Sequence, residues 1–183
     1  MLDAALMIAA ENGLEALTIG TVGRAASAPK SLVLYHFGSR DKLVSSAVDH
    51  AAARVQAARR DAMDSAGSDP REQLRAWVSA VFTSVDVVQG WCFVTQVTTR
   101  MAPIDGLDRI CSMVAAERGA LAELLERGND DFCWQVPNSE SMASTLLALI
   151  DGLALGFLRT GYDADLDKAA ATCRRAVFDL LVR

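Results

Sequence analysis

The side chains best suited to contact a charged polymer lie in one short stretch near the amino end of the chain. This stretch supplies three cations, Lys30, Arg40 and Lys42, and the hydroxyl groups of Ser31 and Tyr35. Cationic side chains bind phosphate groups, and hydroxyl groups hydrogen-bond to phosphates or to the edges of bases. Their grouping is compatible with a surface that binds nucleic acid, and the alternative is that they are ordinary solvated side chains.

Two short helices joined by a turn are predicted to position these side chains. Thr18 is suited to cap the first helix, and Ile19 and Val22 form an apolar pair within it. Residues 27–29 then turn the chain, and Pro29 fits the first turn of the second helix because its ring fixes a helical φ. This pattern is typical of a helix-turn-helix.

The second of these helices is predicted to have one buried face and one free face. Successive helical residues turn by about 100°, so Val33 points to one side while Ser31 and Tyr35 point to the other. Leu32 and Leu34 lie on the flanks. The free face can therefore contact a partner while the other face packs in the core.

Residues 18–43 resemble the DNA-binding end of the tetracycline-repressor (TetR) family of bacterial regulators. The family pattern of cap, Ile/Val pair, Ala-Ala, turn, Lys, aromatic residues, Ser-Arg and Leu is matched by Thr18, Ile19, Val22, Ala25, Ala26, Lys30, Tyr35, His36, Phe37, Ser39, Arg40 and Leu43. The match covers about the first fifty residues, and the remainder agrees in helical organisation and length. The chain departs from the family at Ser27, where glycine is common, and lacks the basic arm that often precedes the first helix.

The resemblance implies that this region contacts double-stranded DNA, and the residue types suggest how. Lys30 and Arg40 begin helices, where cations and backbone N–H groups can meet phosphates together. Phosphate contacts are expected from Thr18, Lys30, His36, Arg40 and Lys42, and contacts to bases or backbone from Ser31, Leu32, Leu34 and Tyr35. Alternatively, Leu32, Leu34 and Tyr35 could anchor a protein partner, which would make the chain a helical adaptor.

Charge is divided unevenly along the chain. The net charge is −5, but residues 1–60 hold seven Lys and Arg against five Asp and Glu, and residues 61–183 hold eleven against eighteen. Because local charge sets the field near a phosphate backbone, a mildly basic head on an acidic body is compatible with DNA binding. The head is so weakly basic that two heads are expected to act together.

Composition favours helices over strands, and the helix boundaries together with the resemblance imply an all-α fold with an N-terminal three-helix head and a C-terminal helical bundle. Apolar residues make up 51% of the 183 residues, 6% are aromatic, and no run favours a strand. We divide the chain into a DNA-binding domain, residues 1–46, and a ligand-binding and dimerisation domain, residues 47–183. Besides the helix-turn-helix pair, helices are predicted over residues 2–12, 39–65, 69–88, 90–101, 107–127, 139–159 and 165–182.

The chain has no segment that predicts secretion or membrane insertion. Its most apolar part, residues 142–158, is seventeen residues long and contains Asp151 and Gly152, so it is too short and interrupted to cross a bilayer. The opening carries Asp3 and no basic region, unlike a signal peptide. We therefore expect a cytoplasmic protein without a membrane partner.

The four cysteines predict neither a metal site nor a disulfide framework. Cys92, Cys111, Cys133 and Cys173 show no Cys-x-x-Cys spacing, and we interpret them as buried thiols. The alternative is a thiol-based redox-sensing regulator, which needs an accessible cysteine in an electropositive setting. With two histidines and no metal, phosphate-loop or dinucleotide motif, the chain is predicted not to be an enzyme and to need no cofactor.

The last two predicted helices are expected to form a homodimer interface. Both carry apolar stripes, and small residues such as Gly152 and Gly156 would let helices approach closely. The predicted interface residues are Leu146, Leu149, Leu153, Phe157, Cys173, Val177 and Leu180. The alternative is that these surfaces form the core of a monomer, and the resemblance favours the dimer.

The body is expected to hold a pocket for an unknown small-molecule effector, as the resemblance implies. The candidate lining residues are Trp77, Phe82, Trp91, Phe93, Gln96, Thr99, Met113, Phe132, Trp134 and Met142, a set that suits a mostly apolar ligand. Each of them could equally belong to a plain bundle core. The sequence thus predicts a dimeric transcriptional regulator, a repressor by resemblance, that leaves a palindromic operator when its effector binds.

Overall fold

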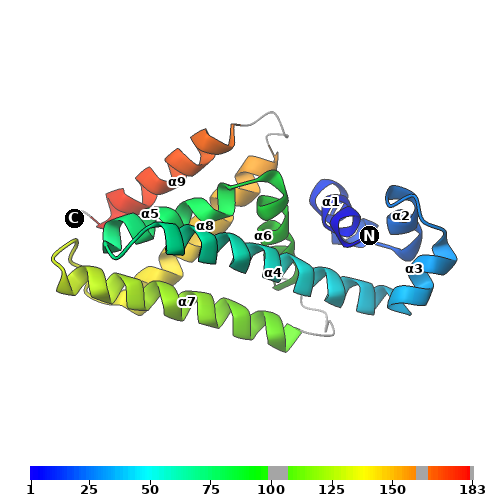
Figure 1. Ribbon diagram of the computed structural model, residues 1–183, viewed down its shortest axis with the longest axis horizontal. Coiled ribbons are helices and arrows are strands. Elements are labelled where there is room, and N and C mark those ends of the chain that lie inside the picture. The colour runs from blue at the N-terminus through cyan, green and yellow to red at the C-terminus, as the bar shows by residue number, and fades with distance from the viewer. Residues whose placement is uncertain (99–106, 160–164, 182–183) are drawn as a thin grey trace.

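The computed structural model describes residues 1–98, 107–159 and 165–181, and all regular elements in these ranges are helices (Figure 1). They are α1 (Leu2–Asn12), α2 (Ile19–Ala25), α3 (Lys30–Phe37), α4 (Arg40–Ser65), α5 (Pro70–Ser79), α6 (Val85–Thr98), α7 (Leu107–Asp130), α8 (Ser139–Arg159) and α9 (Leu166–Leu181), with 3₁₀ turns η1 (Leu14–Ala16) and η2 (Ala80–Phe82). The predicted all-α fold, with a helix-turn-helix near the amino end, is confirmed.

Helices α1, α2 and α3 form a small head at one end of the molecule (Figure 1). Leu6, Val22 and Val33, one from each helix, are completely buried and belong to one hydrophobic cluster. α4 adds Leu43 and Ala47 to the same cluster. The head needs this contribution because three short helices alone bury too little apolar surface to be stable.

α4 continues from the head into the body as one helix of 26 residues (Figure 1). Ala47 and Ala51 pack in the head cluster, and Val55, one turn further on, packs in the cluster of the body. The predicted domain boundary between residues 46 and 47 falls inside this helix. Head and body are therefore joined by a helical rod rather than by a flexible linker.

α6 connects the same two parts, because its side chains belong to both hydrophobic clusters. Val88 and Cys92 pack in the body, whereas Phe93 and Val97 pack in the head cluster. α6 lies against both α1 and α4. A shift of α6 would therefore change the packing of the head as well as that of the body.

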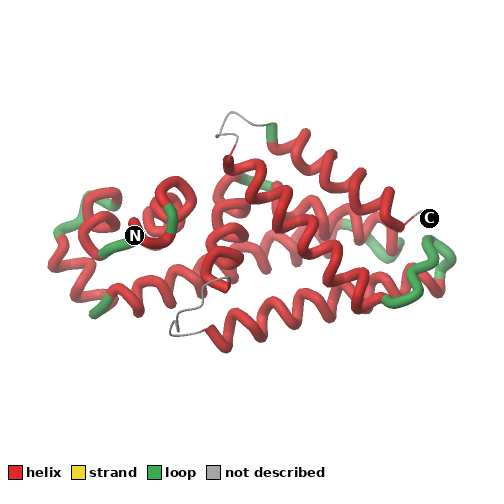
Figure 2. The backbone as a smooth tube through the Cα atoms, turned by 180° about the vertical axis from the view of Figure 1, so that it is seen from behind, coloured by secondary structure: helices red, strands yellow, loops and turns green. Residues whose placement is uncertain are grey.

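In the body, α5 and α7 lie against the far part of α4, and α9 lies against α5 and α8 (Figures 1 and 2). α8 lies at its centre and contacts α6, α7 and α9. Its core includes Leu74 of α5, Leu121 and Leu125 of α7, and Leu146 and Ile150 of α8, all completely buried. Burial of these side chains supplies most of the free energy that holds the bundle together.

α8 is apolar on more than one side. The sequence predicts that residues 142–158 are too short to cross a bilayer, but the helix is longer, 21 residues from Ser139 to Arg159. By length and composition α8 could cross a membrane, with a mean hydropathy of 1.7 over its best window, of which 33% is buried inside the chain. Leu146, Ile150 and Ala154 are buried in the body core. The helix therefore contributes to the core on one side and keeps an apolar outer face on the other.

The predicted helix over residues 69–88 is wrong in its second half. α5 ends at Ser79, η2 follows, and the chain bends by 87° between the segment that ends at Phe82 and the one that begins at Val85. Ser84 causes the break, because its hydroxyl and its carbonyl oxygen both accept the N–H of Val87 and so start a new helix. The apolar periodicity on both sides of Ser84 concealed this capping signal.

Ser27 makes the turn between α2 and α3 with a φ of +50°, a left-handed conformation that L residues rarely adopt. The turn is closed by a hydrogen bond of 2.8 Å from the N–H of Ala28 to the carbonyl oxygen of Gly23. The serine is therefore held in an unfavourable backbone conformation by its surroundings.

Ser27→Gly is expected to raise the free energy of unfolding by about 0.5–1 kcal/mol, because glycine adopts a positive φ without steric cost. Urea unfolding at a fixed protein concentration measures the change. The control is Ala53→Gly on the exposed side of α4, which should lower the free energy of unfolding by about 1 kcal/mol. A loss of stability in Ser27→Gly would contradict the strain at this turn.

Candidate functional site

The start of α2 is fixed by a reciprocal pair of threonines. Thr18 Oγ1 accepts the backbone N–H of Thr21 at 3.1 Å, and Thr21 Oγ1 accepts the N–H of Thr18 at 2.9 Å. This capping box satisfies two backbone donors at the helix start. Thr18 is exposed, so its hydroxyl group is accessible while it holds the helix in place.

Gly23 sets the distance between α2 and the start of α3. A Cβ atom at this position would lie 2.8 Å from the carbonyl oxygen of Ala28 and 3.4 Å from Val33. The two helices can approach this closely only because residue 23 has no side chain. The angle between α2 and α3 therefore depends on Gly23.

α3 presents the exposed face that the sequence predicts. Val33 is completely buried and anchors the helix, whereas Tyr35 is 85% exposed, Leu34 48% and Leu32 41%. Three large side chains of an eight-residue helix thus remain in water. Such a cluster of exposed apolar groups marks a contact surface.

Polar groups flank this face at both ends of α3. Lys30 and Ser31 are exposed at the N-terminal end, where the first backbone N–H groups of the helix have no partner within it. His36 is exposed near the C-terminal end, and its ring meets that of Tyr35 edge to face, with 5.7 Å between the centroids. Because of these free N–H groups and the charge of Lys30, the N-terminal end of α3 can bind an anion.

Arg40 has a structural role that the sequence did not predict. Its Nε donates to the carbonyl oxygen of Leu17 at 2.8 Å, its Nη2 donates to that of Leu14 at 2.9 Å, and it lies 3.6 Å from the carboxylate of Glu15. These contacts fasten the start of α4 to η1. A phosphate contact by Arg40 would compete with them, whereas the neighbouring Lys42 is exposed.

Gly23→Ala is expected to destabilise the protein by about 1–3 kcal/mol, because the new Cβ would overlap a backbone carbonyl. Gly20→Ala in the same helix is the matched control, since the nearest atom to its Cβ would be 3.8 Å away. The control should gain about 0.5–1 kcal/mol from helix propensity. Denaturant unfolding followed by circular dichroism measures both changes, and equal effects would contradict the close approach at residue 23.

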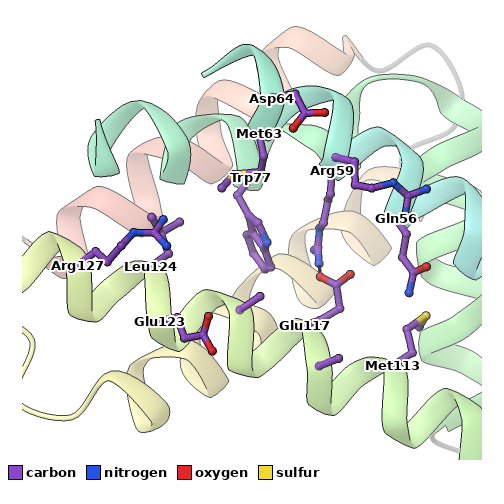
Figure 3. Close-up of a pocket in the computed structure, with 13 residues that line it drawn as sticks. Gln56, Arg59, Met63, Asp64, Trp77, Met113, Glu117, Glu123, Leu124 and Arg127 are labelled. Atoms are coloured by element: carbon purple, nitrogen blue, oxygen red, sulfur yellow. Dashed lines mark ion pairs between the residues drawn. The ribbon is translucent and has the colours of Figure 1, made fainter. Parts of the chain in front are cut away.

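A buried arginine of the body contacts the faces of two tryptophan rings, and Figure 3 shows it beside one of them, Trp77. Arg59 of α4 is 4% exposed, and its guanidinium carbon lies 3.7 Å from the centroid of the Trp77 ring and 4.5 Å from that of Trp91. Glu117 of α7 forms an ion pair with Nη1 of Arg59. Burial lowers the pKa of Arg59 to about 9, although the charge of Asp151 opposes this change. Arg59 is therefore still a cation at neutral pH, stabilised by the rings and the acid.

Asp151 of α8 faces the same cluster. Its Oδ1 accepts the indole N–H of Trp91 at 2.7 Å. Burial raises the pKa of Asp151, while the hydrogen bond from Trp91 and the charge of Arg59 act in the opposite direction. Arg59, Glu117 and Asp151 thus form one charged cluster, which we call the Arg59 cluster, with members from α4, α7 and α8.

Three hollows surround the Arg59 cluster. An outer groove of about 380 Å³ lies between α4 and α7 (Figure 3), and a cleft of about 400 Å³ lies between α7 and α8. Between them, an inner cavity of about 70 Å³ has Trp91, Glu117 and Asp151 in its wall. Glu117 also lines the groove and Asp151 also lines the cleft, so the inner cavity adjoins both.

Three of the predicted pocket residues, Trp77, Trp91 and Met113, line these hollows. That these three residues line an effector pocket stays a prediction. Thr99 lies outside the described residues. The ionisable groups of the pocket, however, were absent from the prediction.

Six other predicted pocket residues lie elsewhere. Phe82, Phe93, Trp134 and Met142 pack in or against the hydrophobic clusters, Gln96 is half-buried away from the three hollows, and Phe132 is 87% exposed. Trp134 illustrates the reason: its Nε1 donates to the carbonyl oxygen of Leu125 at 2.8 Å, and a Cβ at Gly128 would overlap its ring. Phe82, Phe93 and Trp134 thus fill gaps between helices instead of lining one of the three hollows.

The predicted dimer interface also needs correction. Four of its residues, Leu146, Phe157, Cys173 and Val177, are buried inside the chain itself and cannot contact a partner in this structure. Periodicity could not separate the two apolar faces of α8, so residues of the inner face were assigned to the interface. Leu149 and Leu153 are half-buried, and Leu180 is 36% exposed.

The four cysteines fall into two classes. Cys92 and Cys173 are completely buried, and burial raises the pKa of each thiol to about 12. Cys133 is half-buried and Cys111 is exposed. The interpretation of all four as buried thiols is therefore wrong for Cys111, and a thiolate-based sensor could not use Cys92 or Cys173.

A thiol reagent such as 5,5′-dithiobis(2-nitrobenzoate) at pH 8 is expected to modify Cys111 and Cys133 and to leave Cys92 and Cys173 intact until the protein unfolds. Buried thiols react slowly because they are both inaccessible and protonated. Mass spectrometry of the native and the urea-unfolded protein identifies the modified residues. Rapid modification of Cys92 in the native protein would contradict its burial.

No group of three His, Cys, Asp or Glu side chains in the described parts of the chain could hold a metal ion. The site residues that sequence reasoning missed are Arg59, Glu117 and Asp151. Ala51, Val55 and Arg59 follow one another at intervals of four, which places the arginine on the buried face of α4. A charged residue in a buried stripe was the signal that could have found it.

Comparison with known proteins connects both parts of the molecule to one family. Residues 1–47 match the model of the family described as "Bacterial regulatory proteins, tetR family". The whole chain is 30% identical to the HTH-type transcriptional regulator BetI from Burkholderia mallei and covers 91% of that protein. The relationship therefore extends beyond the helix-turn-helix.

Solved structures share the fold over the full length. The MbdR regulator from Azoarcus sp. CIB is similar with a TM-score of 0.84 at 18% identity, covering 100% of this chain and 97% of that one. A regulator from Saccharomonospora viridis, solved in complex with choline, has a TM-score of 0.76 at 18% identity, covering 100% and 95%. At these identities the likeness shows the arrangement of helices alone.

Proposed function

Because this chain belongs to the TetR family of bacterial transcriptional regulators, we propose that it represses transcription by binding a palindromic operator as a homodimer. It is related to DNA-binding regulators and is not an enzyme. The observation that carries the proposal is the face of α3, where Tyr35, Leu34 and Leu32 stay exposed beside Lys30. A helix of this kind can enter the major groove and read base edges.

Within this proposal the residues of the head divide by role. Lys30, Lys42, His36 and Thr18 contact phosphates, whereas Tyr35 contacts bases or backbone. Ser31, Leu32 and Leu34 face the bases, where a leucine can pack on a thymine methyl group. Arg40 acts by holding η1 against α4, since its Nε and Nη2 already donate to backbone carbonyls.

A second copy of the chain is the proposed occupant of the outer face of α8 and α9. Only 33% of the best apolar window of α8 is buried inside the chain. The outer face carries Ala148 and Gly152, and a Cβ at Gly152 or Gly156 would meet no other group within 4 Å. Small side chains on an open apolar face favour close packing of helices across a two-fold axis.

Two-fold symmetry then determines the form of the operator. Two α3 helices that read the same face of DNA must lie about one helical turn, or roughly 34 Å, apart. Two weakly basic heads on one dimer bind more tightly than one, because the second contact is intramolecular. The proposed operator is therefore palindromic. The proposed location of the protein is the cytoplasm, because bacterial DNA lies there.

Release by a small effector completes the proposed function. The hollows around the Arg59 cluster lie between α4, α6, α7 and α8, and α4 and α6 also pack in the head. A ligand that binds one arrangement of these helices better than another would change the separation of the heads. The choline complex of the structural neighbour supports the body as the place for such a ligand.

The test is selection of bound fragments from genomic DNA, followed by titration of the selected duplex at several salt concentrations. We expect a palindromic motif. Tyr35→Ala should lose most of the preference for this motif, and Lys30→Ala should reduce the slope of log affinity against log salt by about 2 per dimer, because two phosphate contacts are lost.

Arg71→Ala, an exposed arginine of α5 in the body, is the control and should leave both the motif and the slope unchanged. Enrichment of no motif, or binding that does not depend on salt, would contradict the proposal. The second outcome would favour a helical adaptor, in which Leu32, Leu34 and Tyr35 anchor a protein partner.

A further inference from the structure

α3 lies at the outer end of the head and exposes a polar strip between two apolar side chains (Figure 1). Tyr35 is 85% exposed, and Ser31, one turn before it, is exposed on the same side. Leu32 and Leu34 are 41% and 48% exposed. Because two positions apart on a helix differ by about 200°, the two leucines lie on opposite flanks of this strip.

The surroundings of the two leucines indicate which partner covers them. Lys30 at the start of α3 and Lys42 just beyond its end are exposed, and α3 itself contains no acidic residue. The first backbone N–H groups of α3 also have no partner within the helix. A cationic surround of this kind complements the two phosphate backbones that border a groove of DNA. Charge therefore favours DNA over an apolar protein surface as the occupant.

α3 is poorly equipped to recognise bases by paired hydrogen bonds. It contains no arginine, asparagine or glutamine, and its lysine, Lys30, lies at its first position. The two arginines of residues 1–47 lie elsewhere: Arg24 is in the last turn of α2, the helix that crosses the backbone in a helix-turn-helix, and Arg40 donates to backbone carbonyl groups of the head. Base recognition by α3 must therefore use apolar contact as well as hydroxyl groups.

We propose that Leu32 and Leu34 make the protein select thymine on both strands of each half-site, by packing on the 5-methyl groups. This inference rests on the proposed function, because it names the chemical group that α3 recognises within the operator. The methyl group of thymine is the apolar group that bases present in the major groove, and it lies on the side nearest its own strand. Leucines on opposite flanks of α3 therefore reach methyl groups of opposite strands.

The same contacts select against G·C pairs. A G·C pair presents hydrogen-bonding groups and no methyl group in the major groove. A leucine over such a pair would remove these polar groups from water without pairing them, which costs free energy. Over thymine, the leucine instead buries a methyl group. Each leucine thus combines a favourable contact with one base and an unfavourable contact with another, and specificity depends on this difference.

The experiment replaces thymines of the selected operator with deoxyuridine, which lacks the 5-methyl group and keeps the hydrogen-bonding groups of the base. Fluorescence anisotropy measures the affinity of the purified full-length protein for each duplex. Burial of one methyl group contributes about fourfold to affinity, so replacement at a contacted position in both half-sites should weaken binding about tenfold. We expect one such position on each strand of a half-site. Unchanged affinity after replacement of every thymine in both half-sites would overturn the proposal.

Two variants assign the methyl groups to the leucines. Leu32→Ala should no longer distinguish thymine from deoxyuridine on one strand, and Leu34→Ala should no longer do so on the other. Both side chains are exposed in the free protein, so both variants should fold, which circular dichroism verifies. Met7→Ala, at an exposed apolar residue of α1, is the matched control and should distinguish the two bases on both strands. Full discrimination by both leucine variants would overturn the assignment.

5-Methylcytosine tests the methyl group apart from the rest of thymine. Replacement of a contacted T·A pair by C·G in both half-sites should weaken binding, because the methyl group is lost and polar groups are covered. 5-Methylcytosine at the same positions should recover about tenfold of the affinity, since it returns the methyl group to the same place in the groove. Equal affinity for cytosine and 5-methylcytosine would contradict contact with the methyl group.

Selection of an operator separates this inference from the proposed function. If a palindromic operator is selected and its binding depends on salt, but deoxyuridine leaves the affinity unchanged, recognition of methyl groups is refuted and operator binding stands. If no duplex is selected, the proposed function fails first, and the two leucines with Tyr35 become the anchor for a protein partner.

Discussion

The packing of α4 in two hydrophobic clusters is the constraint on which the rest of the molecule depends. Leu43, Ala47 and Ala51 are buried with α1, α2 and α3, and Val55 is buried with the body helices. Because an α-helix rises by 1.5 Å per residue and bends little, the orientation of the head follows from that of α4. The contacts of Arg40 with η1 complete the attachment at the start of this helix. No flexible joint therefore separates α3 from the body, and the orientation of α3 depends on that of α4.

Arg59 lies on the same helix, about two turns after Ala51, and the Arg59 cluster connects it to α7 and α8. A buried guanidinium whose Nε and Nη2 have no hydrogen-bond partner among the described residues is costly unless rings and acids compensate it, and here both do. Such a site stabilises the fold less than an apolar core would. Its charged groups can, however, form ion pairs and hydrogen bonds, which apolar side chains cannot. Its position between α4, α6, α7 and α8 places that chemistry where a ligand can influence the head.

The fold and the exposed side of the head were predictable from the sequence, because local signals determine them. Thr18, Pro29 and Ser39 mark the starts of helices, Thr18 and Ser39 by capping and Pro29 by its fixed φ. The helical spacing of Val33 and Tyr35 places them on opposite faces of α3, one buried and one exposed. The bend at Ser84 was missed, because apolar residues on both sides of it continued one helical pattern.

The interior was much less predictable, because it depends on contacts between helices distant in the sequence. Nothing local distinguishes Trp91, which lines the inner cavity, from Trp134, which fills a gap above Gly128. For the same reason, the stripe on α8 could not show that Leu146 faces inward. Arg40 was predicted to contact phosphate, as its charge suggests, yet its partners Leu14 and Leu17 are recognisable only in three dimensions.

The central claim is that α3 of each protomer lies in a major groove of the operator. Methylation protection of guanine N7 tests it most directly, because this atom is exposed only in the major groove. The account predicts two protected segments on one face of the duplex, about one helical turn apart. Protection confined to one segment, or full reactivity of N7 under saturating protein, would contradict it.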